Sequence, residues 1–226
     1  IGISDGGELK DFLDKIKAPG FFFDPVYNPS GQPRIGFGYF VGGILGLLLN
    51  LKILNYPKDK IISAINDIKI KEIENEAEQM AKKILNKYPY YIVSEFLTGV
   101  GNAIANQTNE TAKSISSFRV IPELNHHLME GLKNPKELAK ISLFIFFFSK
   151  LFSSSIQKRF YITKEVIEKN NIETVWYELK GQNKVEQVFE LMAFGNYLTM
   201  NLSSLYGENP VTVPYVDYFK KKLKEI

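Results

Sequence analysis

The chain has 226 residues, 45% of them hydrophobic and 23% charged, so it can form one large or two small globular domains and is too apolar to be disordered. Its 28 basic and 25 acidic residues give a net charge of only +3, which is too balanced for a dedicated nucleic-acid binder. The absence of cysteine excludes disulfides, thiolate metal sites and a cysteine nucleophile.

The first part of the chain alternates short apolar runs with an amphipathic stretch. Residues 1–4 and 21–23 are predicted strands, and residues 8–17 between them have apolar side chains at helical spacing. Because the chain opens with Ile inside a predicted strand, we expect a fragment of a longer protein. No basic segment followed by an apolar run marks a signal peptide here, and we expect a cytoplasmic protein.

A loop rich in proline, glycine and asparagine covers residues 24–34 and precedes an uncharged run of seventeen residues, 35–51. This run contains five glycines and falls short of the ~20 apolar residues that span a bilayer. We therefore predict a helix packed inside the protein, with a membrane helix as the alternative, and expect no membrane partner.

The remaining pattern is typical of an α/β protein with a parallel sheet. The run 141–148 (ISLFIFFF) is expected to form a central strand that is buried on both faces. Further strands are predicted at 90–93, 118–121 and 174–179, and helices at 58–67, 72–87, 96–113, 185–205 and 214–224. These elements suggest four segments: 1–30, a remnant of one subdomain; 31–55, a linker and core helix; 56–205, a second subdomain; and 206–226, a basic helix.

The only two histidines, His126 and His127, are adjacent and follow a predicted strand. Sites in parallel sheets form at the carboxyl ends of strands, and imidazole is a common general acid or base, so one of the two could serve a cleft. The competing interpretation is a helix start that Asn125 caps, with a histidine in solvent. A metal site is not expected, because no third histidine and no cysteine exists.

Glu110 lies in a polar run, 106–113, sixteen residues before His126, with one short predicted strand between them. The run could simply be solvated. A carboxylate and an imidazole that met at one cleft would suit proton abstraction beside a carbonyl, and we expect Glu110 and His126 to approach each other.

Three weaker candidates remain. Arg34 closes the loop at a subdomain junction, where ligand clefts are common, or forms a surface ion pair. The turn at Ser4 (Ser-Asp-Gly-Gly) could cradle an anion, although a simple turn is the preferred interpretation. The terminal run 219–224 (FKKKLK) is either an exposed basic face or the source of one lysine for a cleft.

Four of these segments, in this order, resemble the bifunctional phosphoglucose/phosphomannose isomerase family of the sugar isomerase (SIS) fold. The turn at 4–9 (SDGGEL) looks like the family's S-x-G-G-x-L, and 33–39 (PRIGFGY) is similar to its P-R-x-x-x-G-Y. The stretches 109–113 (NETAK) and 122–126 (PELNH) resemble N-E-N/T-A-K and P-E-L-N-H. The resemblance covers nearly the whole chain and implies a three-layer αβα sandwich with a central parallel sheet, made of the second SIS subdomain and the tail of the first.

The resemblance also implies roles for individual residues. Glu110 would move the proton between C2 and C1 of the sugar, and His126 would assist ring opening. Arg34 would stabilise the enediolate, with Pro33 and Ser4 beside the substrate, and Lys220 would lie near the ring oxygen through a loose match. Many members have Glu where Leu128 stands here, a departure that bears on substrate preference.

The implied activity is interconversion of glucose 6-phosphate, and of mannose 6-phosphate, with fructose 6-phosphate through a cis-enediol. No metal or organic cofactor is expected, and the partner is a hexose 6-phosphate rather than a nucleic acid. The resemblance implies a homodimer whose subunits share a site, with the phosphate-binding loops before residue 1. The alternatives are another SIS isomerase, such as an amino-sugar phosphate enzyme, and a SIS regulator that binds sugar phosphate without catalysis.

Overall fold

The structure is a computed structural model that describes residues 1–225, and it divides into two compact units, Ile1–Ser63 and Ala64–Ile226. The first unit pairs two short parallel strands, β1 (Gly2–Ser4) and β2 (Gly20–Phe22), through α1 (Gly7–Lys15). It continues into α2 (Phe37–Asn50), and α3 (Lys58–Asn66) crosses the division. The four segments expected along the chain remain predictions.

The predicted apolar helix forms as α2, but most of its residues are half-buried rather than fully enclosed. Gly43 is its buried residue, and a Cβ there would lie 2.6 Å from the Phe21 ring of β2, so the glycine permits the close approach of helix and sheet. Ile44, the next residue, is 49% exposed. A helix of fourteen residues is ~21 Å long, whereas the three-residue strands beneath it extend ~10 Å, so they cover only part of it. None of the helices in residues 1–225 is long and apolar enough to cross a membrane.

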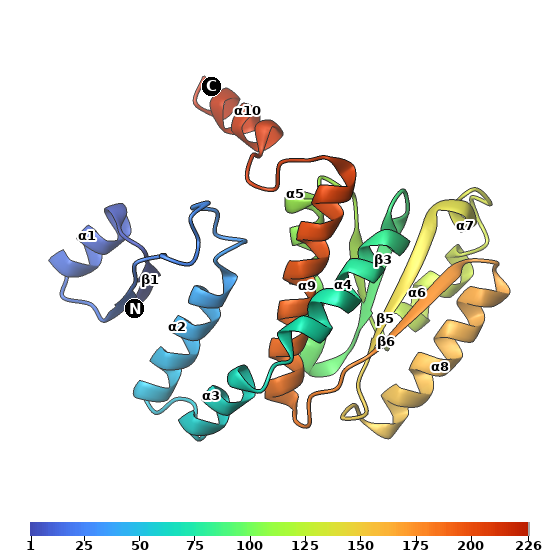
Figure 1. Ribbon diagram of the computed structural model, residues 1–226, viewed down its shortest axis with the longest axis horizontal. Helices are drawn as coiled ribbons and strands as arrows, with labels where there is room; N and C mark the ends of the chain where they lie inside the picture. Colours follow the sequence, from blue (N-terminus) through green and yellow to red (C-terminus); the bar gives the residue numbers. More distant parts are fainter. Residues whose placement is uncertain (226) are drawn as a thin grey trace. The chain divides into compact units, whose positions relative to one another are not determined.

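The second unit is built on a parallel four-stranded sheet in the order β4-β3-β5-β6 (Figure 1). Its strands are β3 (Tyr88–Val93), β4 (Ser117–Val120), β5 (Ser142–Phe148) and β6 (Glu173–Glu178). Its helices are α4 (Ile70–Ile84), η1 (Glu95–Leu97), α5 (Thr98–Thr111), α6 (Leu124–Gly131), α7 (Leu138–Ile141), α8 (Ser154–Lys169), α9 (Lys184–Tyr206) and α10 (Pro214–Leu223).

The helices of this unit form two layers. α4, α5 and α9 pack together on one face of the sheet, while α6 packs against α8 on the other (Figure 1). Right-handed crossovers explain the division, because α5 connects β3 to β4 in one direction across the sheet, while the later connections run in the other. The three-layer sandwich with a parallel central sheet is therefore confirmed.

The core follows from the apolar run of β5. All seven residues of this strand are buried, which confirms the predicted central strand. Phe148 lies with its ring centroid 4.7 Å from that of Trp176 on β6 and 5.7 Å from that of Phe160 on α8. On the opposite face, a Cβ on Gly195 of α9 would lie 2.5 Å from Ile104 of α5, so only glycine allows these two helices to pack this closely. The helix that carries Glu110 is thereby fixed to the core.

Candidate active site

Glu110 lies in the last turn of α5, close to the amino end of β4. The neighbouring Asn109 explains the turn between them: its Oδ1 accepts a hydrogen bond of 2.8 Å from the backbone N–H of Ser116, one residue before β4 begins. The Ser116 hydroxyl donates in turn to the carbonyl of Ala105 at 2.8 Å. The first residue of the NETAK stretch thus fixes the local backbone, and Glu110 projects from an ordered helix end.

Lys113, the last residue of the same stretch, ties this helix end to a distant part of the chain. Its Nζ donates to the carbonyl oxygen of Glu110 and to that of Asn209, both at 2.8 Å. Asn209 belongs to the loop 207–213 between α9 and α10. Sequence reasoning missed this contact, because no local pattern relates two residues 96 positions apart.

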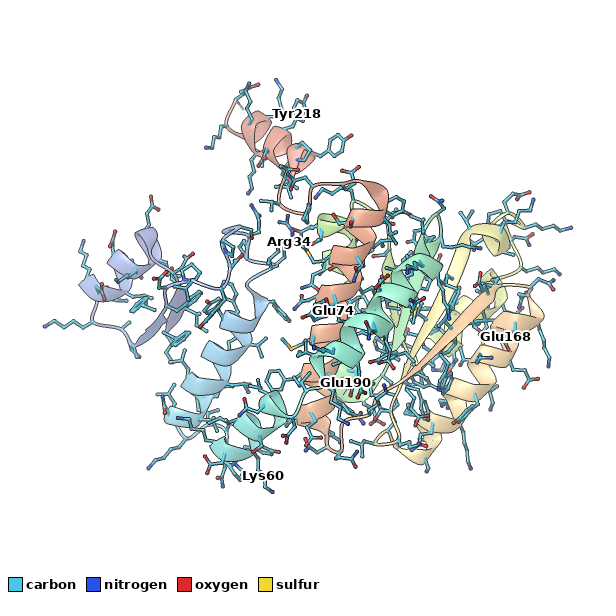
Figure 2. All side chains as sticks on the ribbon, in the orientation of Figure 1. Arg34, Lys60, Glu74, Glu168, Glu190 and Tyr218 are labelled. Atoms are coloured by element: carbon cyan, nitrogen blue, oxygen red, sulfur yellow. The ribbon has the colours of Figure 1, made fainter. Side chains whose placement is uncertain are left out.

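Lys220 lies in α10, which this loop leads into, and its side chain is exposed. Tyr218 of the same helix is 63% exposed (Figure 2). Lys113 therefore holds the loop that leads into α10 beside the end of α5, close to the backbone of Glu110. The role of Lys220 itself stays a prediction.

His126 follows the opposite end of β4. The backbone N–H of Ile121 donates to the Val93 carbonyl at 3.0 Å and the Ser94 hydroxyl to the Ile121 carbonyl at 2.5 Å, which holds the chain where β3 and β4 end. His126 then lies in the first turn of α6 and is exposed. The Nε2 atom of His127 lies 3.6 Å from a carboxylate oxygen of Glu123.

The competing interpretation is correct in its helix start and its exposed histidine, but the cap by Asn125 is wrong. α6 begins at Leu124, so Asn125 is already inside the helix, and its side-chain amide donates to the Thr163 hydroxyl of α8 at 2.7 Å. Asn125 thus fixes α6 to the neighbouring helix on the same face of the sheet.

The expected meeting of Glu110 and His126 at one cleft of the chain is also wrong. Glu110 lies near the amino end of β4, whereas His126 follows its carboxyl end. The four residues of β4 alone extend ~13 Å, since a strand rises about 3.3 Å per residue. The helices that carry them, α5 and α6, cover opposite faces of the sheet (Figure 1). The short spacing of sixteen residues suggested that the two side chains lie close together. Instead, β4 carries the chain to the carboxyl edge of the sheet, and α6 then packs in the helix layer on the face opposite α5.

The first unit holds the other three predicted residues. The Ser4 hydroxyl donates to the Gly6 carbonyl at 2.6 Å and accepts from the Gly6 N–H at 3.1 Å, which favours a simple turn at this position. Gly7 has a φ of 67°, a conformation that suits glycine. Arg34 donates from Nη1 to Oε1 of Gln32 at 2.8 Å, and Pro33 between them is exposed.

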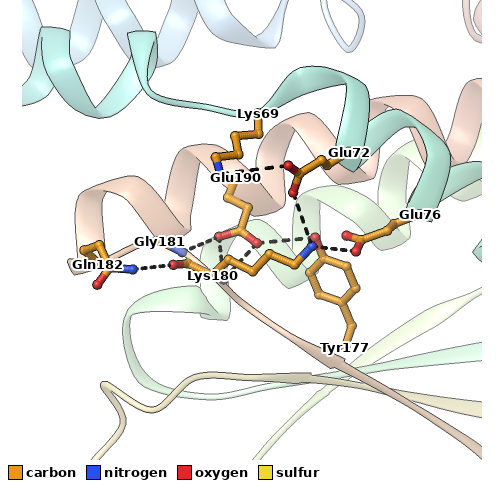
Figure 3. Close-up of polar contacts among 8 residues, drawn as sticks. All are labelled: Lys69, Glu72, Glu76, Tyr177, Lys180, Gly181, Gln182 and Glu190. Atoms are coloured by element: carbon orange, nitrogen blue, oxygen red, sulfur yellow. Dashed lines mark hydrogen bonds and ion pairs between the residues drawn. The ribbon is translucent and has the colours of Figure 1, made fainter.

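A cavity of about 410 Å³ opens at a different place, between the start of α4, the loop after β6 and the start of α9. Glu190 of α9 lines it with a side chain that is only 6% exposed (Figure 3). Its carboxylate accepts hydrogen bonds from the backbone N–H groups of Lys180, at 3.0 Å, and Gly181, at 2.8 Å, and from the Tyr177 hydroxyl at 3.3 Å. Backbone N–H groups at the carboxyl edge of a parallel sheet commonly bind a ligand phosphate, but here Glu190 occupies them.

Burial raises the pKa of Glu190, and the hydrogen bonds from the loop oppose that shift only in part. The same burial, together with the nearby Glu190 carboxylate, raises the pKa of Tyr177. A carboxylate between Phe189 and Leu191 in an otherwise apolar stretch was the available signal for this buried group, and the sequence analysis did not use it.

We expect Glu190→Gln to destabilise the second unit by about 2–3 kcal/mol, because an amide NH₂ replaces one acceptor that faces backbone donors. The raised pKa fixes the sign of the pH dependence. As pH rises from the ordinary glutamate pKa to the raised one, the unfolded state ionises first, so wild type loses stability and its advantage over the variant shrinks. Urea unfolding followed by Trp176 fluorescence at a series of pH values measures both effects.

Glu165→Gln is the matched control, since it removes an exposed ion pair with Lys169 and should change stability by less than about 1 kcal/mol. An advantage of wild type over Glu190→Gln that grows with pH would contradict the assignment.

Comparisons with known proteins agree with the sheet and layers described above. Residues 73–223 match the family described as the bacterial phospho-glucose isomerase C-terminal SIS domain. A bifunctional phosphoglucose/phosphomannose isomerase of Caldicellulosiruptor bescii is 28% identical over 100% of this chain and 68% of its own length. The protein of the same name from Aquifex aeolicus is 24% identical over 99% of this chain and 67% of its own length.

A solved structure shows the same fold. A hypothetical protein from Thermus thermophilus superposes with a TM-score of 0.74 at 13% sequence identity, over 99% of this chain and 61% of its own. The chain spans about two thirds of the length of the two curated relatives. Within residues 1–225, no group of three or more carboxylate and histidine side chains could hold a metal ion. Because its matching region covers most of the chain, the protein belongs to the family of bacterial phospho-glucose isomerase C-terminal SIS domains.

Proposed function

We propose that this chain supplies the proton-transferring carboxylate of an isomerase that interconverts glucose 6-phosphate, and mannose 6-phosphate, with fructose 6-phosphate. The observation that carries the proposal is the end of α5, where Lys113 joins the backbone of Glu110 to the segment that leads to Lys220. The proximity of Glu110 to the loop that leads to α10 supports a role for both in one site. Membership of the family and the names of the two curated relatives support the same reaction.

The proposed chemistry needs only proton transfer and charge stabilisation. Glu110 takes the proton from C2 of the open-chain aldose and returns it to C1, which passes through a cis-enediol. His126 acts as acid and base in opening the sugar ring, and Lys220 lies near the ring oxygen. The guanidinium of Arg34 stabilises the enediolate charge, with Ser4 and Pro33 beside the substrate.

The separation of Glu110 and His126 within one chain adds a requirement to this proposal. If both act on one substrate, they must come from two chains. A twofold dimer meets the requirement, because in an isologous pair each subunit contributes the same residues to its partner's site. We therefore propose a homodimer with two sites, each combining Glu110 of one chain with His126 of the other.

The direct test is turnover by the intact protein, measured as fructose 6-phosphate formed from glucose 6-phosphate and from mannose 6-phosphate. We expect both substrates to react, and activity to persist after treatment with a chelator, since no step uses a metal. Tight binding of sugar phosphates without turnover would support the regulator instead. Turnover of amino-sugar phosphates alone would assign the chain to another SIS enzyme.

A further inference from the structure

The second residue after α5 adopts a backbone conformation that is unusual for its type. Lys113 has a φ of 53°, in the left-handed region, where a Cβ is disfavoured and glycine or asparagine is usual at a helix end. In this conformation a lysine is less stable than a glycine would be. Contacts of the side chain can offset this cost.

The hydrogen bonds of the Lys113 ammonium are such contacts. It lies against the last carbonyls of α5, 2.8 Å from that of Glu110 and 3.4 Å from that of Thr111. These carbonyls lack partners within the helix and form the negative end of its dipole, so a cation is favourable there. The third bond, 2.8 Å to the carbonyl of Asn209, joins the helix end to the loop 207–213.

That loop is short and held at its start. Gly207 ends α9 with a φ of 69°, and the Ser203 hydroxyl donates to the Glu208 carbonyl at 2.8 Å. Oδ1 of Asn209 accepts from the backbone N–H of Val211 at 2.9 Å, and α10 begins at Pro214. Only four residues separate the Lys113 contact at Asn209 from the first turn of α10, so this contact limits where the helix can lie.

We propose that Lys113 is a positioning residue, which fixes the backbone of Glu110 and the segment that carries Lys220 against each other. This rests on the proposed function for its effect on catalysis, whereas the anchoring itself is independent of any reaction. The ammonium donates to backbone carbonyls of both segments. Loss of the anchor therefore lowers the rate of the chemical step by misplacing two groups, and leaves substrate binding nearly unchanged.

Three variants of the intact protein test the proposal. Lys113→Met removes the charge and keeps the chain length, and Lys113→Gly removes the side chain but relieves the backbone. Lys113→Arg keeps a cation with several donors. In the Met and Gly variants we expect backbone amide exchange in 208–224 to become about tenfold faster and kcat to fall about tenfold with KM within twofold of wild type. The Arg variant should keep amide exchange and kcat close to their wild-type values.

Lys17→Gly is the matched control, because Lys17 is also a lysine with a φ of 53° but follows α1 in the first unit. It should leave both measurements unchanged. Unchanged exchange in Lys113→Gly would overturn the anchor, and faster exchange with a normal kcat would overturn the positioning role. A wild-type protein without isomerase activity would overturn the proposed function and the role in catalysis, while the exchange data alone still decide the anchor.

Discussion

Glu110→Gln in the intact protein is expected to lower kcat for glucose 6-phosphate isomerisation by at least ~10²-fold, the usual scale for loss of a general base. The amide keeps the size of the side chain and its capacity to form hydrogen bonds, but it cannot accept the proton from C2. The helix end should keep its contact with Lys113, because that lysine donates to the backbone carbonyl of Glu110, which the substitution leaves in place. Initial rates over a range of substrate concentrations separate kcat from KM.

The loss should appear in kcat, with KM nearly unchanged when chemistry is slow, because we expect other residues to bind the substrate phosphate. Glu165→Gln, on the surface of α8, is the control and should retain wild-type kinetics. Near-native turnover by Glu110→Gln would remove the central residue from the proposed mechanism. A large rise in KM at constant kcat would instead make Glu110 a binding residue.

The order of helices and strands was predictable because the periodicity is strong and local. The run ISLFIFFF has a single small polar residue, Ser142, and no charge, which favours a strand buried on both faces, as β5 confirms. The apolar run 35–51 correctly predicted a helix but not how far it is buried. Burial depends on which other segments pack against the helix, and the local sequence does not contain that information. α7 was not predicted and α6 was considered only as an alternative helix start at Asn125, because neither helix is long enough to show a period.

The site was harder to predict because it depends on topology. Spacing alone cannot tell whether a strand between two residues brings them together or carries the chain across the sheet, as β4 does between Glu110 and His126. The contact of Lys113 with Asn209 and the burial of Glu190 are likewise non-local. The motifs identify individual residues but not the groups that they contact. The structure shows the hydrogen-bond partners of Lys113 and Glu190. It also shows that Glu110 and His126 of one chain lie apart.

That separation leads to the second large effect, which concerns heterodimers of two inactive chains. Let one chain carry Glu110→Gln and the other His126→Asn, each with its own affinity tag, so that the mixed dimer can be isolated. If the sites are shared, one site of this dimer holds two altered residues and the other holds both native ones. The heterodimer should then recover about half of the wild-type rate, although each homodimer is inactive.

The reciprocal heterodimer is the control, with both substitutions on one chain and a wild-type partner. With shared sites, each of its two sites lacks one catalytic residue, and it should be inactive although one chain is entirely native. Sites formed within single chains predict the reverse: no activity for the first heterodimer and about half for the second. A further heterodimer of Glu110→Gln with His127→Asn should be as active as one of Glu110→Gln with wild type, because His127 faces Glu123 in its own chain. A monomeric protein with full activity would contradict the shared site outright, and one of the two residues would then have no part in the reaction.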